Sequence, residues 1–152
     1  MPKRLKLYLD TSVPNAYFDD RNPYRQEITK RFWLKLNEYQ VVISDLVIRE
    51  MEATGDEKLR KKLIDIVKDF ESISTKSDEI ILLSEEYISK GIIPAKHLED
   101  AIHIAAATIN SVDILVSWNF EHIVKLKTKR EVNAVNTLLG YSPIEIVEPA
   151  ML

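Results

Sequence analysis

Three acidic residues, Asp10, Glu50 and Asp100, lie beside apolar stretches of this chain. Burying a carboxylate costs free energy unless it is paired or binds a metal ion. Hard oxygen ligands, without cysteine or a clustered set of histidines, favour Mg²⁺ or Mn²⁺ over Zn²⁺. If the three acids converge on one crevice, the expected chemistry acts on phosphate esters. Such an ion polarises a phosphodiester, activates water and stabilises the leaving oxygen.

Each acid also has an interpretation in which it does no chemistry. Asp10 leads out of an apolar segment into a turn and could cap a helix. Glu50, on or beside a buried helix face, could form a salt bridge or reach solvent from the edge of that face. Asp100 could be a first-turn aspartate that the helix dipole favours. His97 and His103 share the helix of Asp100 and are assigned no role, because lone histidines are more often solvent-facing or hydrogen-bonded in the core than ligands.

The elements that must position these residues follow from the apolar pattern. Short apolar runs predict strands, and apolar residues three and four positions apart predict helices. Strands are expected at 4–9, 40–44, 71–75, 113–117 and 144–148. Helices are expected at 13–20, 23–39, 45–51, 59–70, 77–91, 97–108, 119–126 and 128–141.

Strands that alternate with helices predict a mostly parallel sheet covered on both faces. In such sheets a site forms in the crevice beyond the carboxyl ends of the strands. Asp10 ends the first expected strand and Asn119 lies just past the fourth, so both belong at this edge. Asp113 begins the fourth strand and belongs at the opposite edge, so it is left out of the site.

Composition excludes several classes of protein. The 152 residues, 45% hydrophobic and 30% charged, are typical of one globular domain. The absence of cysteine excludes disulfides, thiol catalysis and cysteine-ligated zinc. No apolar run is long enough to cross a bilayer, and we interpret the N-terminus as a strand rather than a signal peptide, so no membrane partner and a cytoplasmic location are expected. Neither GxGxxG nor GxxxxGK[ST] occurs, so nucleotide binding lacks its phosphate-binding loops.

The formal net charge of −3 argues mildly against a nucleic-acid partner. Metal ions bound among the carboxylates would offset part of that charge. Four basic residues between positions 125 and 130 could contact phosphates beside the site, although a merely solvated basic stretch is an equally good interpretation.

Four segments, in this order, resemble the PIN-domain family of nucleases, which includes VapC-type toxins. They are LYLDTSV around Asp10, ISDLVIREME around Glu50, LEDAIHIAAAT around Asp100 and DILVSWNFEHI around Asn119. The resemblance covers nearly the whole chain and implies a single PIN-like domain over residues 1–152. That domain is a three-layer α/β fold, with a mostly parallel sheet of four or five strands in the order 3-2-1-4-5 and helices on both faces.

The resemblance also implies roles for individual residues. Asp10, Glu50 and Asp100 match the family's three main acids and are expected to be catalytic and to bind Mg²⁺ or Mn²⁺. The family's fourth catalytic position, usually Asp, is Asn119 here. Asparagine can offer a carbonyl oxygen but no charge, so a full second metal site is not expected.

Hydroxyl groups flank these positions and are expected to bind substrate. Thr11 or Ser12 matches the small hydroxyl residue that the family carries beside its first acid. Ser117 lies two residues before Asn119.

The function that the resemblance implies is Mg²⁺- or Mn²⁺-dependent hydrolysis of RNA by an endoribonuclease. Such an enzyme could be the toxin of a toxin–antitoxin pair, with an antitoxin protein as its partner. The alternative is a non-catalytic PIN-fold module that binds RNA or protein. Apolar residues on the helices at 28–36 and 80–88 also suggest a homodimer face.

Overall fold

A five-stranded sheet forms the centre of the computed structural model, which describes residues 3–152. All neighbouring strands are parallel, and their order is β3-β2-β1-β4-β5. The strands are β1 (Lys6–Leu9), β2 (Gln40–Ser44), β3 (Glu71–Ile73), β4 (Ile114–Val116) and β5 (Glu145–Val147). The predicted parallel sheet and its order are therefore confirmed.

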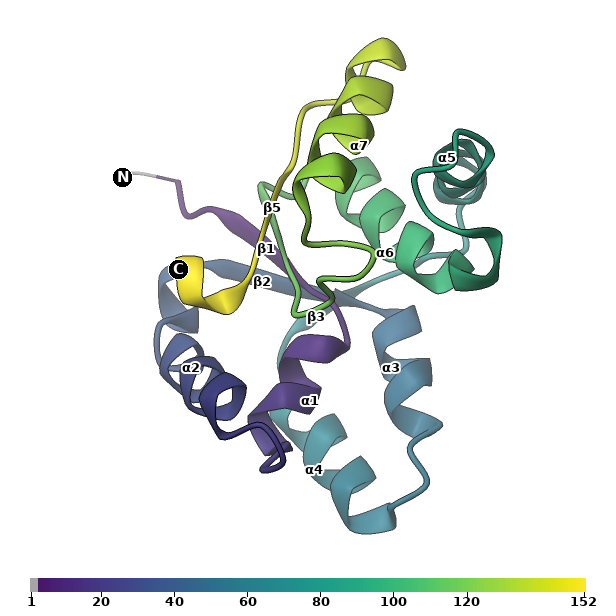
Figure 1. The fold of residues 1–152 in the computed structure, drawn as a ribbon. Helices are drawn as coiled ribbons and strands as arrows, with labels where there is room; N and C mark the ends of the chain where they lie inside the picture. Colours follow the sequence, from purple (N-terminus) through teal and green to yellow (C-terminus); the bar gives the residue numbers. More distant parts are fainter. Residues whose placement is uncertain (1–2) are drawn as a thin grey trace.

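Helices cover both faces of the sheet. Figure 1 shows α1, α2 and α4 on one side of the strands and α5, α6 and α7 on the other. The α-helices are α1 (Ser12–Phe18), α2 (Pro23–Trp33), α3 (Asp45–Glu52), α4 (Glu57–Val67), α5 (Asp78–Ser89), α6 (Leu98–Ile109) and α7 (Leu126–Leu138). Short 3-10 turns are η1 (Leu36–Glu38), η2 (Ala95–His97) and η3 (Pro149–Met151). Within the described residues, no helix combines the length and the apolar character that crossing a bilayer requires.

The central strands are apolar because both of their faces are covered. Leu7, Tyr8 and Leu9 of β1 have no exposed surface, and neither do Leu115 and Val116 of β4. Near-continuous apolar runs of this kind are typical of parallel strands between two helical layers. The core they form holds β1 in the middle of the sheet, so the residue that follows β1 lies at the centre of the sheet edge.

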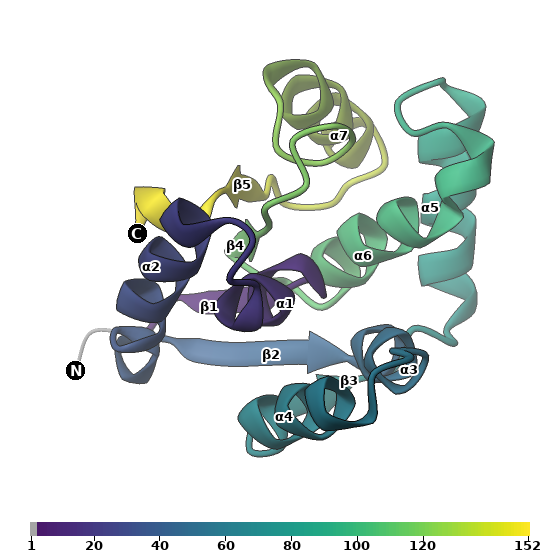
Figure 2. The ribbon, with the colours of Figure 1, turned by 60° about the horizontal axis from the view of Figure 1, so that its bottom comes forward.

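Side chains that suit helix N-termini begin four of the α-helices. Ser44 ends β2 and caps α3, its hydroxyl accepting from the Val47 N–H at 3.4 Å. Asn22, Asp56 and Ser77 cap α2, α4 and α5 in the same way. Figure 2 shows β2 running directly into α3, an arrangement that places the helix of Glu50 at the carboxyl edge of the sheet.

The predicted helix at 119–126 is wrong, because this segment is a series of turns and α7 begins only at Leu126. The Asn119 side chain accepts the His122 N–H at 3.0 Å, and the Asn119 carbonyl accepts from Ile123 and Val124 at 3.1 and 2.8 Å. The Asn119 side chain thus caps a single turn, and the bond from the Val124 N–H, five residues on, closes that turn as at a helix end.

Other predicted elements are present but shorter. The helix expected at 23–39 ends at Trp33 and continues only as the 3-10 turn η1. The strand expected at 71–75 stops at Ile73. Two residues on, the Thr75 N–H donates to the Asp45 carboxylate at the start of α3 instead of to a neighbouring strand.

Candidate active site

The carboxyl edge of the sheet brings together residues that follow adjacent strands. Asp10 follows β1 and donates its N–H to the carbonyl of Val116, the last residue of β4, at 3.3 Å. Ser117 follows β4 directly. Asp113 instead accepts a hydrogen bond from the Lys6 N–H at 2.8 Å, where β1 begins. As predicted, Asp113 therefore lies at the opposite edge of the sheet.

Asp10 is 3% exposed, and both of its carboxylate oxygens accept hydrogen bonds. Oδ1 accepts from the backbone N–H and the hydroxyl of Ser12, and Oδ2 accepts from the Ser117 hydroxyl. These hydroxyls in turn accept from the N–H groups of Trp118, at 2.8 Å, and Asn119, at 2.9 Å. Burial raises the pKa of Asp10, although a neighbouring imidazole and the hydroxyls act in the opposite direction. Asp10 is thus held in one orientation in surroundings that disfavour its charged form.

Glu50 projects from α3 and remains partly open to solvent, its side chain being 35% exposed. Its Oε1 accepts from the Thr11 hydroxyl at 2.8 Å and lies 2.7 Å from His103 Nε2. Burial alone would raise the pKa of Glu50, but the bonds and charge of these neighbours lower it overall. Glu50 is therefore an ionised carboxylate at neutral pH.

His103 belongs to this site, although no role was expected for it from the sequence. Its ring is 3% exposed, and its Nδ1 lies 2.7 Å from the Tyr8 hydroxyl, which lies 2.7 Å from the Ser44 hydroxyl. Burial lowers the pKa of His103, but Glu50, Asp10 and the nearby Asp100 raise it overall. A protonated imidazole would donate from both ring nitrogens, to Glu50 and to Tyr8.

One signal in the sequence could have pointed to His103. It follows Asp100 by three residues in α6, so the two side chains share one helix face. The carboxylate that it pairs with, Glu50, comes from a separate element and could not be inferred from that spacing.

Asp100 lies in the first turn of α6 next to Asn119. Burial raises the pKa of Asp100, while the surrounding imidazoles and the Asn119 side chain act in the opposite direction. The side-chain oxygen of Asn119, Oδ1, accepts the His122 N–H at 3.0 Å, which leaves the NH₂ group of the same side chain to bond to Asp100. Asn119 therefore places a neutral hydrogen-bond donor beside the Asp100 carboxylate, at a position where an acid would place a negative charge.

The structure brings the predicted site residues to one edge. His103 interacts electrostatically with Asp10, Glu50 and Asp100 together, and Asn119 lies against Asp100. The hydroxyls of Thr11, Ser12 and Ser117 bond to the carboxylates of Glu50 and Asp10. A contact of these hydroxyls with substrate stays a prediction.

The expectation that the histidines are not clustered is wrong. His97 and His122, from different segments, stand beside Asp100, and one ligand atom from each of the three lies within 4.8 Å of the others. Among residues 3–152, the ligand atoms of Asp10, Glu50 and Asp100 do not all lie within 4.8 Å of one another.

The topology and helical layers define a PIN-like α/β fold, and the resemblance that the sequence indicated is confirmed at the level of the fold. A chain in the crystal structure of DNA-bound VapBC from Salmonella typhimurium is 15% identical, with a TM-score of 0.55. A chain in the crystal structure of VapBC2 from Rickettsia felis, bound to a DNA fragment from their promoter, is 14% identical, with a TM-score of 0.57. Each match covers 95% of this chain and 98% of the other. No protein-family model matches the sequence, and neither does any curated protein.

Proposed function

We propose that this protein is a Mg²⁺- or Mn²⁺-dependent endoribonuclease that uses Asp10, Glu50 and Asp100 to hold the ion. The observation that carries the proposal is the placement of three carboxylates around one buried imidazole, His103, at the carboxyl edge of a parallel sheet. Ligands and substrates bind at this edge in open α/β sheets.

The residues present fit a divalent cation. Protonated His103 balances one of the three carboxylates. Two formal negative charges remain, which one divalent cation would neutralise. Burial raises the pKa of both Asp10 and Asp100, and a cation beside them would favour their ionised forms. Mg²⁺ keeps several water ligands and takes only one or two carboxylates directly. The spread of these three side chains is compatible with that mode of binding.

Each residue of the network has a distinct part in the proposed reaction. When bound, the ion supplies Lewis acidity toward a phosphodiester oxygen and lowers the pKa of water. Ser12 and Ser117 orient Asp10 through their hydroxyls, and His103 and Thr11 orient Glu50. The buried hydroxyls of Tyr8 and Ser44 in turn fix the ring of His103.

The test is cleavage of single-stranded RNA by the full chain with Mn²⁺ or Mg²⁺, against an EDTA control and a DNA strand of the same sequence. Asp10→Asn and Asp100→Asn should each reduce cleavage by roughly a hundredfold or more, because they remove direct ligands. The matched controls are Glu52→Gln and Glu99→Gln, exposed acids on the same helices as Glu50 and Asp100. Parent-like cleavage by both Asp variants would overturn the assignment.

The alternative function is a non-catalytic PIN-fold module that binds RNA or protein. Asn119 is the observation that favours it, because its carbonyl oxygen already accepts a backbone hydrogen bond and its amide faces Asp100. RNA binding without metal-dependent cleavage by the parent chain would establish this alternative.

The proposal includes an antitoxin protein as partner, supported by the two structural neighbours, which are chains of VapBC complexes. If a small open reading frame adjoins the gene, its product should co-purify with this chain and suppress cleavage. An RNA cleavage rate that is the same with and without that product would contradict the partner assignment.

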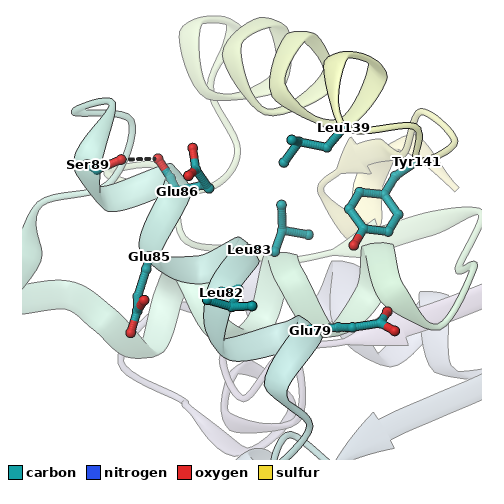
Figure 3. Close-up of a pocket in the computed structure, with 8 residues that line it drawn as sticks. All are labelled: Glu79, Leu82, Leu83, Glu85, Glu86, Ser89, Leu139 and Tyr141. Carbon is teal, nitrogen blue, oxygen red and sulfur yellow. Dashed lines mark hydrogen bonds between the residues drawn. The ribbon is translucent and has the colours of Figure 1, made fainter.

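A homodimer is the other proposed assembly, supported by exposed apolar side chains on α5. Ile81 and Leu82 are 43% and 62% exposed. Beside them, a groove of about 500 Å³ lies between α5 and the segment after α7, with Leu82, Leu83 and Leu139 among the carboxylates of Glu79, Glu85 and Glu86 (Figure 3). Light scattering at micromolar concentration should give the mass of a dimer, and Leu82→Ser should shift it toward the monomer. A monomeric parent chain would contradict the proposal.

A further inference from the structure

Two histidines and an aspartate form a cluster beside the proposed nuclease site. His97 ends η2, Asp100 lies in the first turn of α6, and His122 belongs to the turns between β4 and α7. One ligand atom from each lies within 4.8 Å of the other two. The two imidazole rings face each other, with centroids 4.1 Å apart and planes inclined by 35°.

The backbone around His122 is held in place by hydrogen bonds from both sides. Its N–H donates to Asn119 Oδ1 at 3.0 Å, and its carbonyl accepts from the buried Thr128 hydroxyl at 2.9 Å. The N–H of His97 donates to the Pro94 carbonyl at 2.9 Å. Both ligands therefore project from fixed backbone, as a preorganised site requires.

His122 Nε2 is buried without a hydrogen-bond partner, an unusual state for a polar atom in residues 3–152. The nearest carboxylate oxygen, Glu121 Oε1, lies 3.6 Å away, beyond hydrogen-bond distance. The Glu121 side chain is 82% exposed, whereas that of His122 is 12% exposed. With the ring proton on Nδ1, an unpartnered Nε2 of this kind carries a free lone pair and is suited to bind a metal ion.

The donor set differs in chemistry from the three carboxylates of the proposed nuclease site. Imidazole nitrogens favour Zn²⁺ and its transition-metal neighbours, whereas carboxylates and water suit Mg²⁺ and Mn²⁺. Two imidazoles and one carboxylate, with a water in the fourth position, are a common ligand set for catalytic zinc. Zinc bonds of about 2.0–2.2 Å place tetrahedral ligand atoms about 3.5 Å apart. Side-chain rotations that move the ligand atoms by about an ångström would therefore close this cluster.

We propose that His97, Asp100 and His122 bind a borderline divalent metal ion of the Zn²⁺ type. This site shares Asp100 with the proposed Mg²⁺ or Mn²⁺ site and is otherwise built from different residues. Occupation by Zn²⁺ would therefore withdraw Asp100 from the nuclease site and inhibit cleavage. Only this inhibition rests on the proposed nuclease function, because metal binding by the cluster does not require it.

The first test uses the parent chain and needs no variant. The chain has three histidines, so their side-chain nitrogens can be followed individually by two-dimensional NMR during a titration with ZnCl₂. The resonances of His97 and His122 should shift together and saturate at one equivalent, while those of His103 should change little. A shift of His103 alone, or no saturable shift of His97 and His122, would mean that the two rings only stack and would overturn the proposal.

The second test measures Zn²⁺ affinity by calorimetry for His97→Gln, His122→Gln and Glu99→Gln. Removing a direct ligand should weaken binding by at least about tenfold, since even outer partners of a metal site contribute that much. Glu99→Gln should retain parent Zn²⁺ affinity, because Glu99 is an exposed acid of α6 outside the cluster. Parent-like affinity in both folded His variants would overturn the site, whereas inactive but Zn²⁺-binding parent protein would contradict only the nuclease proposal.

Discussion

His103 Nε2 lies 2.7 Å from Glu50 Oε1, although the two residues belong to helices that follow different strands. The His103 side chain is 3% exposed and that of Glu50 is 35% exposed, so the pair reaches from the core to the surface of the site. A buried imidazole can be charged only where carboxylates compensate it. The protonation of the buried His103 ring therefore depends on the charge of Glu50 at the candidate active site.

Tyr8→Phe should destabilise the fold, because it leaves His103 Nδ1 and the Ser44 hydroxyl without their buried partner. The expected loss in the free energy of unfolding is about 1–3 kcal/mol, the usual cost of an unsatisfied buried polar group. Urea denaturation measures it. Tyr24→Phe is the matched control, because Tyr24 is 66% exposed, and it should change stability little. Equal stability of the Tyr8 and Tyr24 variants would contradict the role of the Tyr8 hydroxyl.

The pH dependence of stability should carry the signature of His103. Its pKa is raised in the folded state, mainly by Glu50 against the opposing effect of burial. The stabilisation from the pair is therefore complete below the ordinary histidine pKa, about 6.5, and is lost as pH rises through the higher folded value. Thermal melts from pH 6 to pH 9 should show falling stability for the parent, and His103→Gln should flatten this slope. An identical slope in the variant would contradict the pairing.

The sheet and its acidic edge could be predicted because their signals are local. An apolar run that stops at Asp10 indicates both a buried strand and its carboxyl end. Glu50 could be placed beside a buried helix face from its spacing to Leu46 and Val47, both of which are buried. The strand order came from the resemblance of four segments to one family, since spacing alone does not determine which strands are neighbours.

The parts that could not be predicted depend on contacts between distant segments. His103 owes its role to Glu50 and Tyr8, and no pattern within its own helix identifies them. His97 and His122 meet in the turns that replace the helix expected at 119–126. Asn119 caps one turn of this segment, and the bond from the Val124 N–H to the Asn119 carbonyl closes it, which the apolar pattern does not reveal.

Asp10→Asn should stabilise the fold in metal-free buffer while abolishing the proposed cleavage. Burial raises the pKa of Asp10, so the folded chain holds this proton more tightly than the unfolded chain does. The parent therefore loses stability as pH rises from the unfolded pKa, about 3.9, through the folded one, and the neutral amide does not. At pH 7 the gain should be on the order of 1 kcal/mol, which raises the Tm by about 2–4 °C for a chain of this size.

The control for this variant is the metal itself. Excess Mn²⁺ should raise the Tm of the parent by binding only the folded state, and should raise that of Asp10→Asn much less. A lower Tm for the variant without metal would show that the charge of Asp10 is already compensated by its hydroxyl partners.

Asn119→Asp should tighten Mn²⁺ binding by roughly tenfold, about 1.4 kcal/mol. The new carboxylate can still accept the His122 N–H through one oxygen, so the turn after β4 should survive. Its negative charge would replace a neutral amide beside Asp100, where burial already disfavours one carboxylate. The variant should consequently be less stable than the parent without metal and recover with Mn²⁺. Calorimetry that finds unchanged or weaker affinity would assign Asn119 to substrate contact or ligand orientation.

Neutralising Lys125, Lys127 and Arg130 together should weaken RNA binding and reduce its salt dependence. All three are exposed, at or just beyond the point where the turns after Asn119 lead into α7. Each lost phosphate contact should lower the slope of log affinity against log salt by about 0.7 for single-stranded RNA, so about two units in total. The matched control neutralises Lys58, Lys61 and Lys62, which are exposed on α4 on the other side of the sheet and remove the same charge. Fluorescence anisotropy at several salt concentrations compares the two triple variants, and equal slopes would mean that the basic stretch of α7 is simply solvated.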